Sequence, residues 1–268
     1  MPAKGDSGPS GSELLKREEK SRWESTEESG RSIGGALYSD AWTTLERESY
    51  VREYVQLIDD HVDDGARLLD LACGSGKGSR EYLREGSRTG IDVVGVDIAR
   101  DGFLEDWTES AERGEFVVGD ADRLPFETGS FDLVLGRAAL HHIPGWEGQL
   151  LAEVRRVLAA DGAFVFVDPL RYNPFALAFR LLFESRDRTD AEVPLDPFTL
   201  EDQLSRAFSE VELQGHYIVS PVVAMLDRVL PVSTTEASLA IYRAERTVSD
   251  GVAFPFAGEV TGIARYPR

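Results

Sequence analysis

A glycine-rich segment directly follows an apolar run at residues 68–78, which read LLDLACGSGKG. Glycine lets the backbone approach a ligand closely, and the helix expected after the segment begins with unpaired N–H donors. The segment differs from a Walker phosphate loop, because Gly78 stands where that loop needs Ser or Thr. It also departs from the dinucleotide fingerprint, because Ser79 stands where that motif has its third glycine or alanine. The segment therefore indicates a nucleotide-like ligand without identifying it.

Two acidic residues follow the next two apolar runs. Asp97 ends the run 93–97, roughly 20 residues beyond the glycines, where an acidic side chain can accept hydrogen bonds from ribose hydroxyls. A solvated aspartate at the end of a strand is the alternative. Asp120 lies in the segment GDADRLPF at 119–126 and could accept from an adenine amino group. Since ligands bind at the carboxyl edge of such sheets, we expect both carboxylates in one site.

Together these segments resemble the class I S-adenosylmethionine-dependent methyltransferases, and within them the ubiquinone/menaquinone-biosynthesis branch with its small-molecule relatives. The resemblance covers about residues 68–168. It rests on five segments, which read LDLACGSG, GVD, GDADRLPF, SFDLV and EVRRVLAADG. It implies a methyltransferase that binds S-adenosylmethionine and modifies a small molecule.

The resemblance also implies roles for single residues. Asp70 would orient the glycine loop or reach the methionine amino group, and Arg137 would lie near the methionine carboxylate. Asp97 would hold the ribose, Ile98 would cover the adenine, and Asp120 would mark the adenine end. The full implied set is Asp70, Ala72, Gly74, Gly76, Asp97, Ile98, Asp120, Ala121 and Arg137.

Methyl transfer from a sulfonium is an in-line displacement, so the enzyme mainly aligns the reactants and excludes water. It requires no metal, and it requires a base only if the nucleophile carries a tightly held proton. The candidate bases are His141 and His142, after the fourth strand, and Asp168, at the end of the fifth. The alternatives are structural: one histidine packs in the loop while the other is exposed, and Asp168 caps its strand.

Two other functions remain open. The first is a protein of the same fold that binds the cofactor or a partner without catalysis, although the acidic set Asp70, Asp97 and Asp120 is intact. The second is an NAD(P)-dependent oxidoreductase, which the imperfect dinucleotide fingerprint disfavours.

Strands and helices are expected to alternate around these motifs. Apolar residues at helical spacing predict a helix over 38–58. Two late strands are expected at 211–219 and 260–265. Together with five earlier runs they predict a doubly wound α/β fold, with a mostly parallel seven-stranded sheet and a helical lid. The five earlier strands are expected at 67–73, 91–97, 116–119, 131–135 and 163–168.

The chain is expected to form one domain over 33–268, preceded by a flexible polar tail at 1–32 that carries a charged helix near 12–24 and is dispensable for cofactor binding. The expected parts are an N-terminal helical lid (33–64), a cofactor-binding half (65–169), a helical cap (170–208), and C-terminal strands with a helix (209–268). We expect the acceptor pocket to be bounded by Tyr38, Trp42, His142, Asp168, Tyr172 and Phe175.

The amino-acid composition limits the classes of molecule that the chain is expected to bind. With 48 acidic and 29 basic residues the net charge is -19, which repels phosphate backbones and argues against a nucleic-acid substrate. The single cysteine, Cys73, excludes an internal disulfide. No membrane-length apolar run or signal-peptide core is present, so a cytoplasmic location is expected. Only four of the basic residues are lysine, so the acidity has two explanations: adaptation to high salt, or a genome that favours arginine codons.

Overall fold

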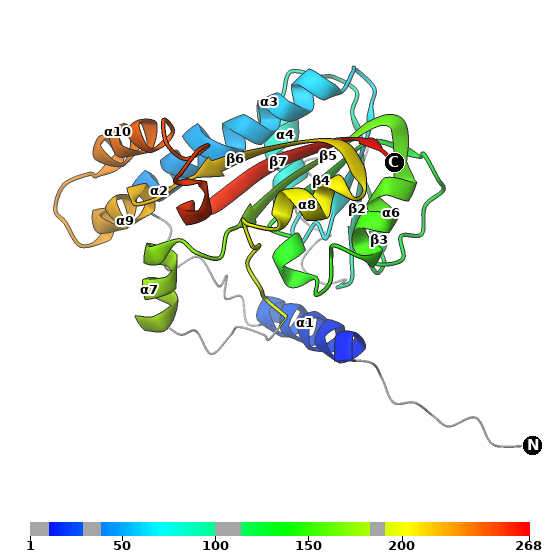
Figure 1. Cartoon of the computed structure of the whole chain (residues 1–268), viewed down its shortest axis with the longest axis horizontal. Coiled ribbons are helices and arrows are strands. Elements are labelled where there is room, and N and C mark those ends of the chain that lie inside the picture. The colour runs from blue at the N-terminus through cyan, green and yellow to red at the C-terminus, as the bar shows by residue number, and fades with distance from the viewer. Residues whose placement is uncertain (1–10, 29–38, 100–113, 183–190) are drawn as a thin grey trace, which may run out of the picture.

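Seven strands form one sheet in the order β3-β2-β1-β4-β5-β7-β6 in the computed structural model of the chain, which describes residues 11–28, 39–99, 114–182 and 191–268 (Figure 1). β1 to β5 are parallel, whereas β7 runs antiparallel to both β5 and β6. The doubly wound, mostly parallel sheet predicted from the sequence is therefore confirmed. The strands are β1 (Arg67–Leu71), β2 (Asp92–Asp97), β3 (Gly114–Val118), β4 (Phe131–Arg137), β5 (Leu158–Pro169), β6 (Phe208–His216) and β7 (Glu259–Pro267).

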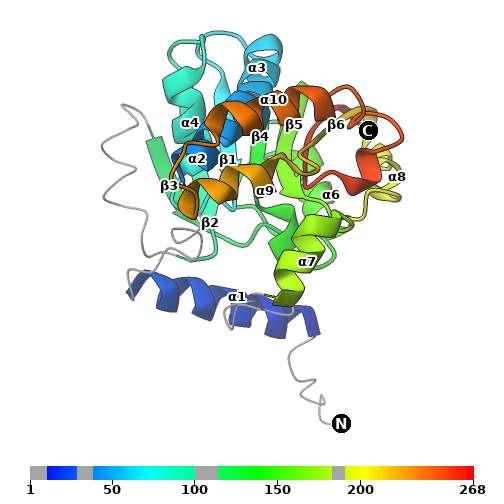
Figure 2. The same ribbon diagram turned by 90° about the vertical axis from the view of Figure 1, so that its left-hand side faces the viewer.

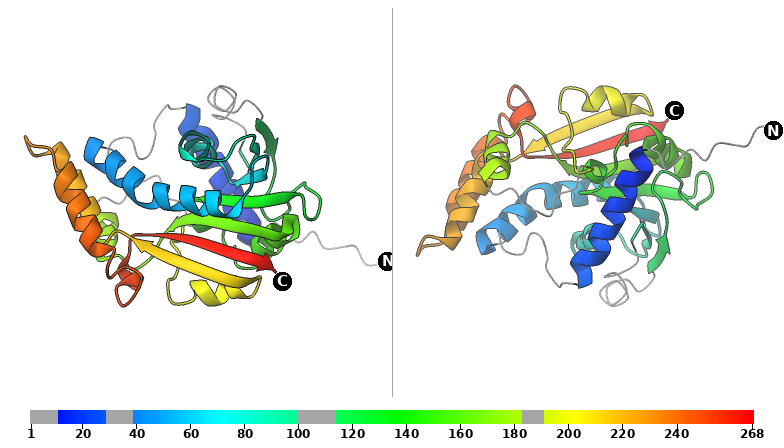
Figure 3. Two further views of the ribbon diagram at one scale, coloured as in Figure 1. Left: turned by 90° about the horizontal axis from the view of Figure 1, so that it is seen from above. Right: turned by 90° about the horizontal axis from the view of Figure 1, so that it is seen from below.

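Helices cover both faces of the sheet and gather at one of its ends. Seen from above, the blue α3 and the yellow α8 lie on opposite sides of the strands (Figure 3). The longer helices are α1 (Gly11–Glu28), α2 (Asp40–Glu46), α3 (Arg52–His61), α4 (Lys77–Glu85), α6 (Gln149–Val157), α7 (Pro174–Leu182), α8 (Leu200–Ser205), α9 (Ser220–Met225) and α10 (Thr235–Glu245). Short turns of other helix types are η1 (Arg47–Val51), η2 (Leu140–His142), η3 (Leu226–Arg228) and η4 (Phe254–Phe256).

The core has two layers because successive side chains of a strand point to opposite faces. Leu69, Val94 and Val134 belong to the cluster that includes α6 and α8. Leu68 and Val93, each one residue earlier, belong to the cluster that includes α3 and α4. Strands that are buried on both faces read as continuous apolar runs, which is why the sequence reveals them.

The helix expected over 38–58 is divided in two. α2 and α3 are joined by η1, a turn of π-helix in which Ser49 leaves helical geometry (φ -117°, ψ -113°). Such turns often re-aim a side chain toward a functional site. Here Tyr50 lies in the turn, and its hydroxyl donates to Glu46 Oε1 at 2.6 Å. The turn therefore directs an aromatic side chain toward the end of β4, where Arg137 donates to the same hydroxyl at 3.0 Å.

One end of the sheet carries most of the remaining helices. α7 follows the carboxyl end of β5, and α9 follows that of β6. Figure 2, which looks toward this end, shows them in front of the strands together with α2 and α10. α1 lies below the sheet in Figure 1, apart from the other helices. Within the described residues, no helix combines the length and the apolar character needed to cross a bilayer.

Candidate active site

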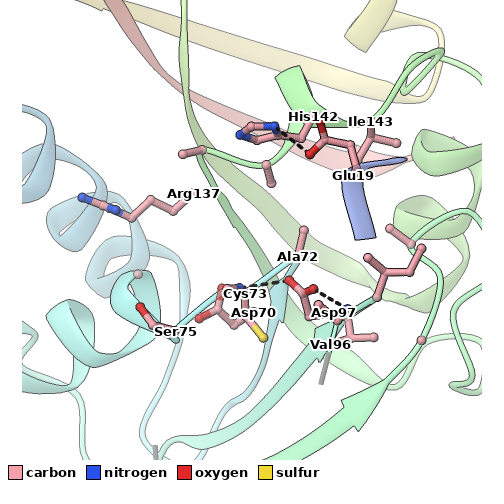
Figure 4. A pocket seen from close by; sticks show the side chains of 18 of the residues that line it. Glu19, Asp70, Ala72, Cys73, Ser75, Val96, Asp97, Arg137, His142 and Ile143 are labelled. Carbon is pink, nitrogen blue, oxygen red and sulfur yellow. Dashed lines mark hydrogen bonds and ion pairs between the residues drawn. The ribbon is translucent and has the colours of Figure 1, made fainter. Parts of the chain in front are cut away.

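A cavity of about 290 Å³ lies where the carboxyl ends of β1, β2 and β4 meet. Its lining includes the glycine loop, the residues after β2 and β3, the turn after β4, and two side chains of α1 (Figure 4). This is the edge at which open parallel sheets bind ligands. The cavity therefore lies at the edge of the sheet where the sequence analysis expects the site.

The glycine loop is shaped by left-handed backbone. Gly74 has φ 46° and Gly76 has φ 65°, values that glycine adopts at little cost. Ala72 and Ala138 adopt similar values, 48° and 52°, at the ends of β1 and β4. Non-glycine residues rarely adopt this conformation, and they do so mainly at functional sites. The two central strands thus both end in turns that expose backbone to the cavity.

Asp70 lies beneath the loop, where the resemblance places it. Its Oδ2 accepts from Ser79 Oγ at 2.5 Å and from the Ser79 N–H at 3.2 Å, which ties β1 to the first turn of α4. The carboxyl group is buried and lines the cavity. Burial raises its pKa to about 7, and the two bonds from Ser79 only partly offset this. Asp70 thus holds the loop in place and takes up a proton near neutral pH.

Asp97 lies at the end of β2 and faces the cavity. Its Oδ2 accepts from the Gly74 N–H at 3.0 Å, and its Oδ1 accepts from the Ala99 N–H at 2.9 Å (Figure 4). Burial raises the pKa of this carboxyl, while the backbone donors lower it. The remaining lone pairs of both oxygens are those that could accept ribose hydroxyls.

Asp120 is paired with a residue that the sequence analysis does not assign to the site. Lys16 Nζ, on α1, donates to both oxygens of Asp120 at 2.8 Å and lies 2.7 Å from Asp122 Oδ2. Burial disfavours the lysine charge, yet the bonds to Asp120 and Asp122 raise its pKa overall. The carboxylates at the adenine end of the expected site therefore anchor α1.

Arg137 lines the cavity, but its guanidinium points away from Asp97 (Figure 4). Its Nε lies 3.2 Å from Glu81 Oε2, and a terminal nitrogen donates to the Tyr50 hydroxyl. A second cation, Lys77, also lines the cavity at the start of α4, with Nζ 3.7 Å from Glu46 Oε2. Both cations could meet the carboxylate of a ligand at this end.

The turn after β4 holds the two histidines. His141 Nδ1 lies 2.6 Å from Asp168 Oδ1, and the same oxygen accepts the His141 N–H at 3.1 Å. Burial, followed by the nearby His142, lowers the pKa of His141. His142 stacks on His141 with ring centroids 4.0 Å apart, and its Nδ1 lies 3.4 Å from Glu19 Oε2 of α1. Only His142 of the three candidate bases lines the cavity.

The cavity accounts for most of the residues expected to bind the cofactor. All of these residues line the cavity except Gly76, which directly precedes α4 and shapes the glycine loop. Lys16 and Glu19 were not expected there. Their helix is almost entirely charged, so no apolar stripe in the sequence marks a buried face. Only the ion pairs in the structure show that Lys16 and Glu19 belong to the cavity lining.

The acceptor pocket expected from the sequence stays a prediction, because the cavity described above is the one that the expected cofactor residues line. Trp42 packs beside Tyr217, with ring centroids 6.5 Å apart, because Ser39 just before α2 bonds to the Ala224 carbonyl in α9. Asp168 is fully buried behind His141. Of the expected boundary, the cavity lining contains only His142, and Tyr38 lies outside the described residues. The other two boundary residues that do not line the cavity are Tyr172 and Phe175.

In the parts of the chain that the structure describes, no cluster of three His, Cys, Asp or Glu side chains could hold a metal ion.

Comparison with known proteins identifies this region. Residues 69–166 match the family model described as a methyltransferase domain. An uncharacterized methyltransferase of Synechocystis sp. is 36% identical over 131 residues, which is 46% of this chain and 59% of that protein. The phthiotriol/phenolphthiotriol dimycocerosates methyltransferase 1 of Mycobacterium ulcerans is 37% identical over 120 residues, which is 43% of this chain and 42% of that protein. The matches thus span less than two thirds of these curated relatives.

Solved structures agree in fold. The 1,6-didemethyltoxoflavin-N1-methyltransferase of Burkholderia thailandensis, with S-adenosylhomocysteine bound, superposes with a TM-score of 0.59 at 19% identity over 99% of this chain and 95% of that one. The [4+2]-cyclase SpnF superposes with a TM-score of 0.57 at 17% identity over 97% of both chains. At these identities the likeness concerns the fold alone, and the second protein is named for a different reaction.

Proposed function

We propose that this chain, which contains a class I methyltransferase domain, transfers a methyl group from S-adenosylmethionine to a small-molecule acceptor. The observation that carries the proposal is the coincidence of two results. The matched segment 69–166 contains the glycine loop, Asp97 and Asp120, and these same residues surround the cavity at the carboxyl edge.

The residues around the cavity fit this cofactor. Asp97 offers two carboxylate oxygens to the ribose hydroxyls, with Ile98 and Ala121 beside the adenine. The exposed backbone of Gly74 and Ala72 accommodates the methionine part, close to the cations Lys77 and Arg137. An acidic residue can accept hydrogen bonds from the ribose hydroxyls, and the cations can pair with the ligand carboxylate.

S-adenosylmethionine supplies an electrophilic methyl group on a sulfonium. The chain contributes alignment and exclusion of water, since the transfer needs no covalent enzyme intermediate. Lys16 and Glu19 of α1 line the cavity, so we expect this helix to limit the access of solvent. His142 is the group placed to accept a proton, with His141 and Asp168 behind it.

A small-molecule acceptor is favoured by the charge of the chain. A net charge of -19 repels nucleic acid, whose binding requires a basic surface. The cavity is a concave site of about 290 Å³, the kind of site that takes small molecules.

The test is turnover. Cofactor binding is measured first by calorimetry, and then formation of S-adenosylhomocysteine is measured with a panel of phenols, amines and quinols. We expect product with at least one class. Cofactor binding with no product from any class would favour the second candidate, a catalytically silent protein that binds the cofactor or a partner.

A further inference from the structure

Glu259 carries a partly buried carboxylate at the end of the sheet where the cavity lies. It is the first residue of β7 and lies opposite Pro169, at the carboxyl end of β5. In the part of the chain that the structure describes, no residue forms a hydrogen bond or an ion pair with this side chain. Burying a carboxylate is costly unless a partner compensates for the lost water. Glu259 therefore lacks the compensation that a buried carboxylate normally has.

The charged groups around Glu259 are already paired with one another. Arg137 Nε lies 3.2 Å from Glu81 Oε2, and Asp168 Oδ1 lies 2.6 Å from His141 Nδ1. Burial, followed by the like charge of Asp168, raises the pKa of Glu259 to about 8, and the attraction of Arg137 offsets only part of this. The local balance of charge therefore favours an added cation beside Glu259.

Two tyrosine rings lie near this carboxylate. Tyr50 and Tyr217 meet edge to face, with ring centroids 6.0 Å apart and ring planes at 75°. Burial raises the pKa of both hydroxyl groups, and the nearby Glu259 adds to this effect. Tyr217 follows β6 in a left-handed backbone conformation (φ 61°), which residues other than glycine adopt mainly at functional sites. Aromatic rings beside a carboxylate are suited to organic cations, because the ring quadrupole attracts positive charge.

The region adjoins the end of the cavity to which the proposed function assigns the methionine part. Arg137 lines the cavity, yet its guanidinium points away from Asp97 and lies 5.6 Å from the centroid of the Tyr50 ring (Figure 4). In S-adenosylmethionine the reactive methyl group is carried by the sulfur of the methionine part, so the acceptor has to lie next to that part. Glu259 stays partly exposed, so a ligand can reach it.

We propose that Glu259, with the rings of Tyr50 and Tyr217, binds a cationic nitrogen of the methyl acceptor, so that the acceptor is an amine. The inference rests on the proposed methyl transfer and deepens it, because it names the chemical class of the acceptor. Glu259 acts in recognition alone: its carboxylate pairs with the ammonium group and takes no part in the transfer. A neutral analogue of the same shape would leave the carboxylate without a counter-ion and would bind less tightly.

Binding of a cation should also release a proton from Glu259. With a pKa of about 8 its carboxyl group is mostly protonated at pH 7, and an adjacent ammonium group favours the charged form. Burial raises the pKa of both tyrosines, so they stay neutral at this pH. The charged or titratable groups that face Glu259 are Glu46 of α2, Tyr50 of η1, Arg137 of β4, Asp168 of β5 and Tyr217 after β6.

The experiment compares Glu259→Gln with Glu210→Gln, a matched control that removes the same charge from the neighbouring strand. Glu210 is exposed on β6 and pairs with Arg265 at 3.1 Å, at the opposite end of the β6–β7 pair. The full chain is saturated with S-adenosylhomocysteine, and calorimetry measures the binding of tyramine and of ethanolamine. Each amine is compared with its neutral analogue, para-propylphenol or n-propanol, in which a methyl group replaces the ammonium group.

We expect the wild type and Glu210→Gln to bind at least one amine about tenfold more tightly than its neutral analogue, and Glu259→Gln to lose that preference. If the wild type prefers neither amine, or if Glu259→Gln keeps the preference, Glu259 does not bind the acceptor. The affinity of Glu259→Gln for S-adenosylhomocysteine should stay within about twofold of the wild-type value, which shows that the variant is folded.

Proton release supplies a second measurement, which needs only the wild type. Calorimetry at pH 7 in two buffers of different ionisation enthalpy should show release of about one proton for each amine bound. Binding of the amine without proton release would also overturn the proposal. Failure of the wild type to bind S-adenosylhomocysteine would instead contradict the proposed function, so the two failures are distinguishable.

Discussion

At the scale of single residues, the proposed function predicts that cofactor binding depends most directly on Asp97. Replacing it with alanine removes a charged acceptor from the ribose and releases the Gly74 N–H. We expect cofactor binding to weaken by about 1–3 kcal/mol, the usual cost of losing a hydrogen bond to a charged group. Calorimetry with S-adenosylhomocysteine measures this loss.

The control for this prediction is Asp92→Ala, at the start of the same strand. Asp92 is half-exposed and pairs with Arg67 at 3.2 Å, far from the cavity lining. It should leave the affinity unchanged. Equal affinities of wild type and Asp97→Ala would show that Asp97 does not bind the ribose.

Asp70 predicts a pH dependence of stability. Its pKa is raised to about 7 in the folded chain, whereas an unfolded aspartate titrates near 4. Between these values the folded state binds a proton that the unfolded state does not, so stability falls as pH rises through this window. Asp70→Asn removes the titration. Its stability relative to wild type should therefore increase by about 2–3 kcal/mol between pH 5 and pH 8.

Urea unfolding at four pH values between 5 and 8 checks this, with the exposed Asp132→Asn on β4 as the control. Parallel pH profiles for wild type and Asp70→Asn would mean that Asp70 does not carry a raised pKa.

The residue types of the site were predictable, whereas their partners were not. Asp70, Asp97 and Asp120 follow apolar runs at spacings that chemistry explains, so sequence alone places them at one edge. No local pattern in the sequence indicates that Asp120 pairs with Lys16, which lies about a hundred positions earlier. Ion pairs between distant segments leave no periodicity in the sequence.

At the scale of elements, the strands were the most predictable part of the fold. β1, β2 and β4 are largely apolar runs, and the observed strand ends lie within three positions of those expected, except that β5 begins at Leu158, five residues before the expected start. The helical segments outside the matched region were harder to place. α2 could be read as an amphipathic helix, but the sequence does not say that it would pack on α9 and Tyr217 rather than over the cavity.

α1 changes the expectation for the N-terminal segment. Its charged helix was expected within a tail dispensable for cofactor binding, yet it contacts Asp120, Asp122 and His142. We therefore expect removal of residues 1–28 to weaken binding of S-adenosylhomocysteine about tenfold, mainly through faster dissociation, because a lid slows ligand escape.

Removal of residues 1–10 is the matched control, since it shortens the chain but keeps α1. It should leave both affinity and dissociation rate unchanged. Stopped-flow displacement gives the rates. If the two truncations behave alike, α1 does not act as a lid over the cofactor.

At the scale of the whole molecule, we expect cofactor and acceptor recognition to come from different parts of the chain. The matched segment 69–166 supplies the loop, Asp97 and Asp120, which suit any S-adenosylmethionine enzyme. Lys16 and Glu19 lie outside it, and so do the helices packed at the carboxyl end of the sheet. Since functional differences arise where elements vary around a common scaffold, we expect the outer segments to set the choice of acceptor.

The net charge of -19 predicts that the stability of the protein depends on salt concentration. Like charges spread over the surface repel one another, and the screening length falls from about 10 Å at 0.1 M salt to about 3 Å at 1 M. If the acidity is an adaptation, the melting temperature should rise by several degrees between dilute buffer and molar potassium chloride. A flat profile would favour the codon explanation for the many arginines.

Whereas added salt should stabilise the fold as a whole, it should weaken the attachment of α1 to the cavity. Lys16 and its two carboxylate partners are partly exposed, so their attraction is screened while the global repulsion is relieved. We therefore expect dissociation of S-adenosylhomocysteine to accelerate at salt concentrations that raise the melting temperature. In Lys16→Gln the acceleration should shrink, while the melting profile keeps its slope. Equal salt dependence of dissociation in Lys16→Gln and wild type would show that the Lys16 ion pairs do not hold the helix over the cofactor.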